Sequence, residues 1–123
     1  RGGPFEQRLK DAGLPLEPDP ELFFSEISQY FECAPVIREH MRPFSYHLGD
    51  NLDYYEKVVR LEEVDEICSY LSEKIGKEVS LVASNSSRNS INSDKPISSV
   101  ARKMIIDFCS GDIEFLSKYY TID

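Results

Sequence analysis

The chain has few of the residues that build disulfide frameworks, metal centres or tryptophan-rich cores. Its 123 residues include no tryptophan, two histidines, two methionines and three cysteines. Cys33, Cys68 and Cys109 are odd in number, far apart and without the Cys-x-x-Cys spacing of a zinc or redox site. This pattern argues against a disulfide scaffold and a cysteine-ligated metal, and it predicts a reducing, cytoplasmic setting.

Long apolar runs and an excess of positive charge are also lacking. No apolar stretch approaches the roughly 18 residues of a membrane-spanning helix, so we expect no membrane segment and no secretory leader. Acidic residues outnumber basic ones by 22 to 14, which gives a formal charge of -8. This charge opposes binding to nucleic acid or to an anionic bilayer, and an anionic ligand would need a local cluster of positive charge.

The composition that remains is that of one small globular unit. The hydrophobic fraction is 41% and the charged fraction is 29%, which are ordinary values for a globular chain. We divide the chain into residues 1–18, a short helix with a proline-rich connector, and residues 19–123, a mainly helical region.

Apolar spacing and capping residues predict five helices. They cover about residues 4–12, 20–32, 61–75, 99–109 and 113–119. Three of them follow a side chain that can cap a helix, namely Asp19, Asp112, and either Ser98 or Ser99. Gly76 is placed to end the third helix in a left-handed conformation.

Three segments lack helical periodicity. Residues 33–51 contain prolines and a glycine, which predicts an ordered loop with room for one helical turn. Residues 57–61, Lys-Val-Val-Arg-Leu, predict a short strand, because adjacent β-branched residues fit a pleated surface better than a helix. Residues 79–82 could form a second extended piece. The expected fold is therefore α/β, mostly helical with one or two short strands.

The stretch richest in chemical groups is residues 38–67. It contains both histidines, His40 and His47, and it sets Arg42 close to Glu39. Histidine titrates near pH 6.5 and can act as a general base, while the planar fork of arginine suits a phosphate or sulfate. Structural alternatives remain open: His40 as a hydrogen-bonding group, His47 as a loop residue, and Arg42 as the ion-pair partner of Glu39.

Two further places have side chains suited to binding. Ser86, Ser87 and Arg88 combine hydroxyl and guanidinium donors, which suit an oxyanion, although a solvated polar loop has the same composition. Tyr54 could line an acceptor pocket or pack against its neighbours. The acidic cluster at residues 62–66 begins a predicted helix, where the dipole favours negative charge, so it requires no metal.

Taken in order, these segments resemble the C-terminal half of carbohydrate and bacterial sulfotransferases, which use 3′-phosphoadenosine 5′-phosphosulfate (PAPS). The similar parts span about residues 19–120. The first three are Phe23-Phe24 near a helix start, Glu39-His40-Met41-Arg42-Pro43 in place of a His-Trp-x-Pro segment, and Glu62 with the acidic helix that ends at Gly76. The last two are Asn85-Ser86-Ser87-Arg88 and the closing Asp112-Ile113-Glu114-Phe115-Leu116. The glycine-containing phosphate loop of that family and its Arg-Ser segment for the 3′-phosphate do not occur in this sequence.

The resemblance implies the C-terminal part of a P-loop-like sulfotransferase fold. It also implies an enzyme, or a fragment of one, that transfers a sulfuryl group from PAPS to a hydroxyl or amine of a carbohydrate or another small acceptor. The implied roles are His40 as the base, Arg42, His47 and Tyr54 at the acceptor, and Ser86, Ser87 and Arg88 at the nucleotide. We expect this chain alone to be inactive, because the missing N-terminal half would hold the donor. The alternative is a non-catalytic helical interaction module or homodimer that uses an exposed apolar face.

Overall fold

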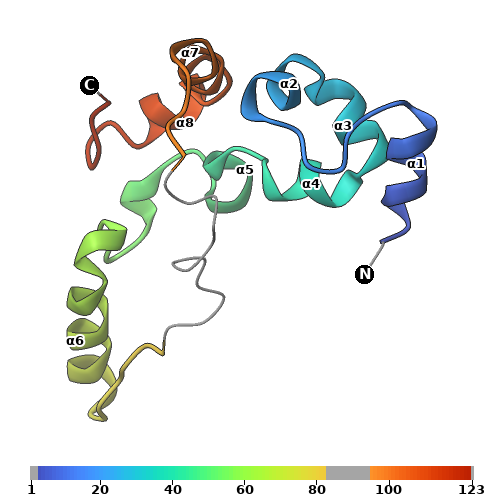
Figure 1. The fold of residues 1–123 in the computed structure, drawn as a ribbon. Coiled ribbons are helices and arrows are strands. Elements are labelled where there is room, and N and C mark those ends of the chain that lie inside the picture. The colour runs from blue at the N-terminus through green and yellow to red at the C-terminus, as the bar shows by residue number, and fades with distance from the viewer. Residues whose placement is uncertain (1–2, 83–94, 123) are drawn as a thin grey trace.

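The computed structural model of the chain describes residues 3–82 and 95–122. Their order is α1 (Phe5–Asp11), α2 (Pro20–Ser25), α3 (Ile27–Cys33), α4 (Pro35–His40), α5 (Phe44–Leu48), η1 (Leu52–Tyr54), η2 (Leu61–Glu63), α6 (Val64–Ile75), α7 (Ser99–Phe108) and α8 (Ser110–Phe115), where η marks a short 3-10 helix. Helices α1 to α4 form one end of the molecule, α5, α7 and α8 lie at its middle, and α6 stands apart from both groups (Figure 1).

The described part of the chain is helical and contains no strand, so the α/β expectation is wrong. Residues 57–60 have no regular hydrogen-bonded structure, and Arg60 has an extended backbone with φ -70° and ψ 154°. Among the described residues, no strand pairs with residues 57–60 or with residues 79–82. β-Branched residues favour an extended backbone, but a strand also requires a neighbour that takes its N–H and C=O groups.

The segment expected as a loop, residues 33–51, instead contains α4 and α5. Pro35 is the first residue of α4, where its missing N–H and its restricted φ are compatible with a helix. Gly49 ends α5 with φ 83°, a left-handed value that favours glycine. These helices have six and five residues, too few for an apolar period to show in the sequence.

Most of the predicted helix ends are confirmed. Asp19 Oδ1 accepts a hydrogen bond from Leu22 N at 2.9 Å, and Ser98 Oγ accepts one from Ala101 N at 3.1 Å. Gly76 ends α6 in the left-handed region with φ 68°. The expected helix over residues 20–32 is divided into α2 and α3 at Glu26.

The largest buried side chains join α1, the connector and α3. Leu9, Leu14 and Tyr30 form the buried cluster, with Leu9 and Tyr30 each 2% exposed. The Tyr30 hydroxyl donates to the carbonyl oxygen of Pro15 at 2.8 Å, which satisfies the buried tyrosine and holds the proline-rich connector against α3.

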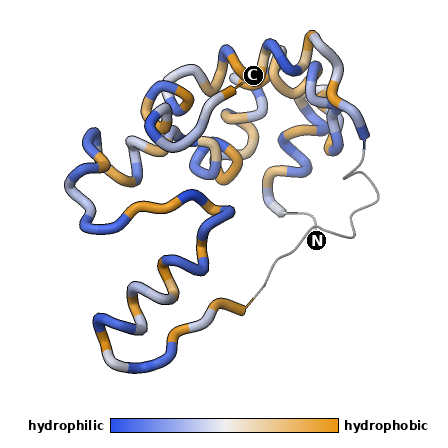
Figure 2. Tube along the Cα trace, turned by 90° about the vertical axis from the view of Figure 1, so that its left-hand side faces the viewer, coloured by the Kyte–Doolittle hydropathy of each residue, from blue (hydrophilic) through white to orange (hydrophobic). Residues whose placement is uncertain are grey.

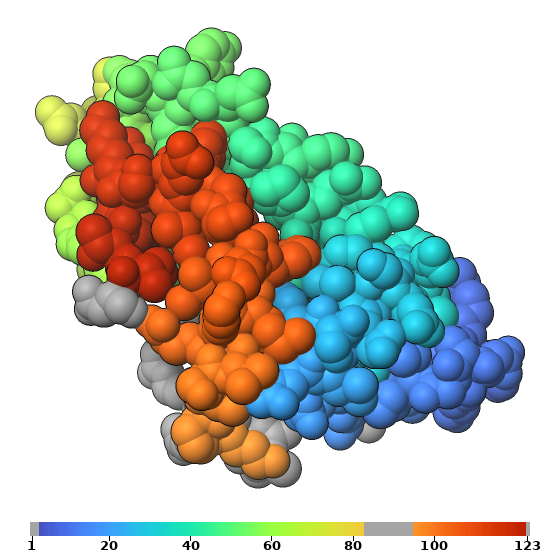
Figure 3. Space-filling model, turned by 90° about the horizontal axis from the view of Figure 1, so that it is seen from above, coloured from blue at the N-terminus to red at the C-terminus, as the bar shows by residue number. Residues whose placement is uncertain are grey.

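Helix α7 extends this packing toward the middle of the molecule (Figure 3). The Phe108 ring meets those of Phe24 and Phe31 edge-on, with centroid distances of 5.5 and 6.4 Å. Ala101 is 1% exposed, and α7 packs closely against α2. The resulting core is small, because the buried apolar residues of the described chain are Leu9, Leu14, Tyr30, Ala34 and Ala101.

No helix in the two described ranges is long and apolar enough to cross a bilayer. The longest, α6, has 12 residues, whereas a spanning helix needs about 20.

Candidate functional site

The residues predicted to bind the acceptor lie on different elements. His40 is the last residue of α4, His47 lies in α5, and Tyr54 ends η1. All three side chains are exposed, and Tyr54 is 87% exposed. The His47 ring contacts the Tyr46 ring edge-on at 5.1 Å. The catalytic role of His40 and the binding roles of His47 and Tyr54 remain predictions.

A cavity of about 470 Å³ lies beside α5 and α8. Its lining consists of Pro43, Ser45, Asp50, Gly111, Glu114 and Phe115. Among the described residues, the lining contains two carboxylates and no cationic side chain, and neither histidine nor Arg42 belongs to it. A cavity of this charge does not suit a sulfate or phosphate group.

Arg42 is engaged within its own segment. Its Nε and Nη2 donate to the two carboxylate oxygens of Glu39 at 3.0 and 2.9 Å, and its guanidinium carbon lies 4.3 Å from the centroid of the Tyr46 ring. The hydrogen bond from Arg42 lowers the pKa of the Glu39 carboxyl group, and the same bond raises the pKa of Arg42. The sequence left Arg42 either as an anion-binding residue or as the ion-pair partner of Glu39, and the structure has the ion pair. The pair uses two of the five N–H donors of Arg42, so a sulfate would meet a guanidinium group whose charge Glu39 already balances.

The predicted nucleotide-binding residues Ser86, Ser87 and Arg88 lie outside the described residues, so their role remains a prediction. Within the ranges that the structure does describe, no group of three or more His, Cys, Asp or Glu residues could hold a metal ion.

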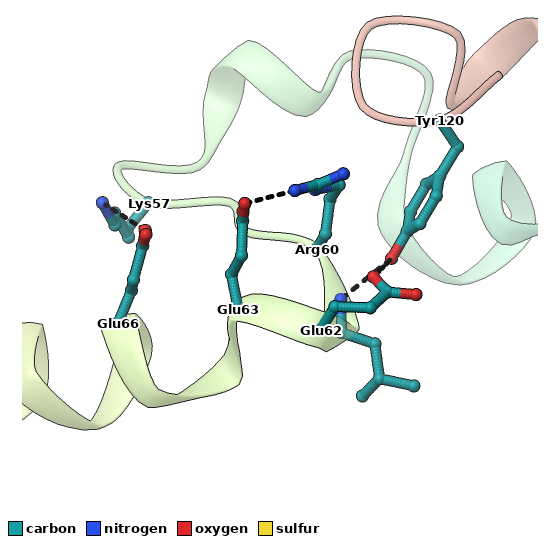
Figure 4. Close-up of polar contacts among 7 residues, drawn as sticks. Lys57, Arg60, Glu62, Glu63, Glu66 and Tyr120 are labelled. Atoms are coloured by element: carbon teal, nitrogen blue, oxygen red, sulfur yellow. Dashed lines mark hydrogen bonds and ion pairs between the residues drawn. The ribbon is translucent and has the colours of Figure 1, made fainter.

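Three long-range hydrogen bonds connect segments on which the predicted sulfotransferase resemblance rests. Asp112 Oδ1 accepts a hydrogen bond from Phe44 N at 2.8 Å, which joins the closing motif to the residue after Pro43. The Tyr120 hydroxyl accepts from Leu61 N at 2.9 Å and donates to Glu62 Oε2 at 3.0 Å (Figure 4). The structure thus brings the chain's C-terminal region against two earlier parts of the resemblance.

Sequence reasoning missed both connections. Asp112 was expected to cap a helix, but α8 begins at Ser110 with Cys109 before it, and the Asp112 carboxylate faces the backbone of another helix. Tyr120 carried no signal, because its partners lie 58 and 59 residues away in the chain. A hydroxyl that bridges distant groups has no local sequence pattern.

The described residues also contain a part that we call the α6 unit, residues 56–82. It comprises η2, α6 and the extended segments on either side of them, and it stands away from the helices at the middle of the molecule (Figure 1). Among the described elements, α6 packs closely against η2 alone. None of its residues is buried.

Ion pairs hold the first extended segment of the α6 unit against α6. Lys57 pairs with Glu66 at 3.8 Å, and Arg60 pairs with Glu63 (Figure 4). The hydrogen bond from Arg60 lowers the pKa of the Glu63 carboxyl group. These pairs are exposed, so each contributes little stability by itself.

A third ion pair involves the last turn of α6. Lys74 pairs with Glu56 at 3.1 Å, and the Lys74 ammonium nitrogen lies 5.5 Å from the centroid of the Tyr70 ring. The Tyr70 hydroxyl and then the Lys74 ammonium group lower the pKa of the Glu56 carboxyl group. The first extended segment is therefore fixed to one flank of α6 at both ends.

An apolar stripe begins at Leu61 in η2 and continues along α6. We call it the α6 seam, and its residues are Leu61, Val64, Cys68, Leu71 and Ile75. Leu61 is 78% exposed, Leu71 40% and Ile75 58%. The hydropathy colouring alternates along α6, as an amphipathic helix requires, but no described helix other than η2 packs closely against it (Figure 2).

A second extended segment borders the other flank of α6. The Ser72 hydroxyl accepts a hydrogen bond from Val79 N at 2.8 Å and donates to Cys68 O at 2.7 Å. A cavity of about 570 Å³ lies between the helix and this segment. It is lined by Asp65, Cys68, Ser69, Ser72, Glu78, Val79, Ser80 and Leu81, with no lysine or arginine among them. An acidic, hydroxyl-rich cavity therefore adjoins the α6 seam at Cys68.

The geometry defines a small helical protein with one amphipathic helix that the rest of the described chain leaves uncovered. No protein-family model matches this chain, and no curated protein and no solved structure matches it either.

Proposed function

We propose that this protein is a helical interaction module and that its α6 seam binds the surface of another protein. The observation that carries the proposal is the exposure of the seam on a helix that packs closely against no described element except η2. Apolar side chains gathered on one helix face, with no covering element, mark a binding surface more often than scattered single residues do.

The stability of α6 supports the same proposal. A helix of 12 residues is marginal in water by itself, and helices in proteins gain most of their stability from packing an apolar face. In this structure α6 is supported by exposed ion pairs and by η2. A partner that covers Leu71 and Ile75 would supply the packing that the described chain does not.

Site-specific photo-crosslinking in the cells that produce the protein tests this proposal. A benzoylphenylalanine at Leu71 is expected to form adducts with another protein, because in this proposal the bound partner covers the seam at Leu71. The same probe at Tyr54, which is 87% exposed and lies in η1, is the matched control and is expected to form few. Equal yields at the two positions, or adducts at neither, would contradict the proposal.

A second candidate function is the acceptor side of a PAPS-dependent sulfotransferase. The hydrogen bond that Asp112 accepts from Phe44 N and the one that Tyr120 donates to Glu62 favour it, because they connect segments on which the predicted family resemblance rests. In this proposal His40 serves as the base, and Arg42, His47 and Tyr54 bind the carbohydrate or other small acceptor. Ser86, Ser87 and Arg88 bind the nucleotide.

Titration calorimetry with 3′-phosphoadenosine 5′-phosphate tests the second candidate. The full chain is expected to bind this nucleotide, and Arg88→Gln is expected to weaken binding. Lys10→Gln is the control, since Lys10 lies in α1, outside the segments that carry the resemblance. Absence of heat at about millimolar nucleotide, where even weak binding of about -4 kcal/mol would register, would remove the proposed role of Arg88.

A further inference from the structure

We infer that the α6 seam receives an amphipathic helix of another protein, with lysine or arginine along the flanks of that helix. The inference rests on the proposed interaction function and names the chemistry of the occupant. Two features of the α6 unit carry it, namely the spacing of the seam and the charge beside it.

The seam has the spacing of a helix that packs along another helix. Its five residues follow one another at intervals of three, four, three and four, which are the a and d positions of a heptad pattern. Side chains at these positions form the narrow stripe into which the knobs of a facing helix insert. Helix α6 has 12 residues and is about 18 Å long at 1.5 Å per residue, so a partner helix of three to four turns would cover it.

The α6 unit as a whole is acidic. Residues 56–82 contain seven acidic and four basic side chains, a net charge of -3, and three of the four basic side chains are already in ion pairs within the unit. Asp65 and Glu78 have no ion pair with any described residue, and both line the cavity that adjoins the seam at Cys68. Asp65 follows the seam residue Val64, at a position from which charged side chains contact a facing helix, and the charged residue at the equivalent position on the other flank, Lys74, is already paired with Glu56.

This charge selects among the occupants that an apolar seam could take. A second copy of the chain would bring a second acidic unit to Asp65 and Glu78, in a molecule that carries a net charge of -8. An anionic bilayer would be repelled in the same way. A helix with basic flanks satisfies Asp65 and Glu78 while its apolar stripe covers Leu71 and Ile75.

Two synthetic peptides test the inference on the full chain. Both have three heptads with leucine at a and d. One has lysine at e and g, and the other has glutamate there. Fluorescence anisotropy is expected to show the lysine peptide binding at least about tenfold more tightly than the glutamate peptide, with a preference that declines as salt is added. Asp65→Asn together with Glu78→Gln is expected to reduce this preference.

Matched variants locate the binding surface. Leu71→Glu and Ile75→Ser are expected to weaken binding of the lysine peptide at least about tenfold, as for central contacts of an interface. Val100→Glu is the control, because Val100 is an exposed apolar residue of α7 with 57% exposure. Circular dichroism establishes that each variant keeps the helicity of the wild-type chain.

Three outcomes would overturn the inference: equal binding of the two peptides, equal effects of Leu71→Glu and Val100→Glu, or a dimer of the chain in sedimentation equilibrium that Leu71→Glu abolishes. The last result would make a second copy the occupant. If photo-crosslinks still form at Leu71 while neither peptide binds, the inference fails and the interaction function stands. If no crosslinks form at Leu71 and neither peptide binds, both the inference and the proposed interaction function fail.

Discussion

The hydroxyl group of Tyr120 donates a hydrogen bond to Glu62 Oε2 at 3.0 Å, across 58 residues of sequence. The Tyr120 hydroxyl oxygen also accepts a hydrogen bond from Leu61 N at 2.9 Å. The C-terminal segment therefore contacts the first residue of the α6 seam. Lys118 adds an exposed ion pair to Asp53 at 3.5 Å. Asp53 and Lys118 lie outside the α6 unit, so the two hydrogen bonds of Tyr120 connect this unit to the C-terminal segment.

Removal of the Tyr120 hydroxyl is expected to destabilise the protein. Tyr120→Phe loses two hydrogen bonds and leaves Leu61 N without its acceptor, which we expect to lower the free energy of unfolding by about 1 kcal/mol. Tyr119→Phe is the matched control, because the Tyr119 hydroxyl has no hydrogen bond to a described residue, and its effect should stay within about 0.5 kcal/mol. Urea denaturation compares the two variants, and equal effects would show that the bridge has no role in stability.

Asp112 should act through the backbone of Phe44 rather than as a helix cap. Asp112→Ala removes the acceptor of the 2.8 Å hydrogen bond, and we expect a loss of about 1 to 2 kcal/mol together with faster hydrogen exchange at the Phe44 amide. Asp112→Asn keeps a carbonyl oxygen at this position and should retain most of the protection. Unchanged exchange at Phe44 in Asp112→Ala would contradict this role.

Core and seam leucines should respond differently to truncation. Leu9 is 2% exposed, so Leu9→Ala is expected to cost about 2 to 5 kcal/mol of unfolding free energy through the cavity that it leaves. Leu71 is 40% exposed and lies on the uncovered seam, so Leu71→Ser should change the stability of the isolated chain by about 0.5 kcal/mol or less. Thermal or urea unfolding measures both. A large loss in Leu71→Ser would mean that the seam is packed within the chain.

The Arg60–Glu63 pair should make the α6 unit sensitive to acid. Arg60 lowers the pKa of Glu63 in the folded chain, so the pair stabilises the folded state above the unfolded pKa of about 4.3, and this contribution is lost as the pH falls through the lowered folded value. Glu63→Gln is expected to reduce helicity near pH 7 and to diminish the loss of helicity below about pH 5.

Glu73→Gln is the control for this titration, because Glu73 lies on α6 without an ion pair to any described residue. Far-ultraviolet circular dichroism across the acid range compares the two variants with the wild-type chain. Identical acid profiles for Glu63→Gln and Glu73→Gln would show that the pair does not contribute to the stability of α6.

The helix ends were predictable because their causes are local. Asp19 and Ser98 each accept a hydrogen bond from a backbone N–H three residues ahead, and Gly76 takes the left-handed conformation that its lack of a Cβ permits. The Arg42–Glu39 pair, an alternative in the sequence interpretation, spans three residues as well. Interactions of this range can be inferred from spacing.

The failed strand shows where local preference is insufficient. Val58 and Val59 favour an extended backbone, and residues 57–60 of the described chain have no helix. A strand also requires a neighbouring strand to accept and donate its backbone hydrogen bonds. The sequence of residues 57–60 does not say whether such a neighbour is present. The short helices α4 and α5 were missed for a related reason, since five or six residues are too few to show a period.

The amino-acid sequence by itself determined the acidic charge, the helical ends and the apolar stripe of α6, because each depends on residue type and on spacings of a few residues. Tertiary structure alone decided that Tyr120 meets Glu62, that Asp112 accepts a hydrogen bond from Phe44, and that no described helix other than η2 packs closely against α6. Contacts between distant residues depend on how whole helices pack, and packing is a collective property that no short segment encodes.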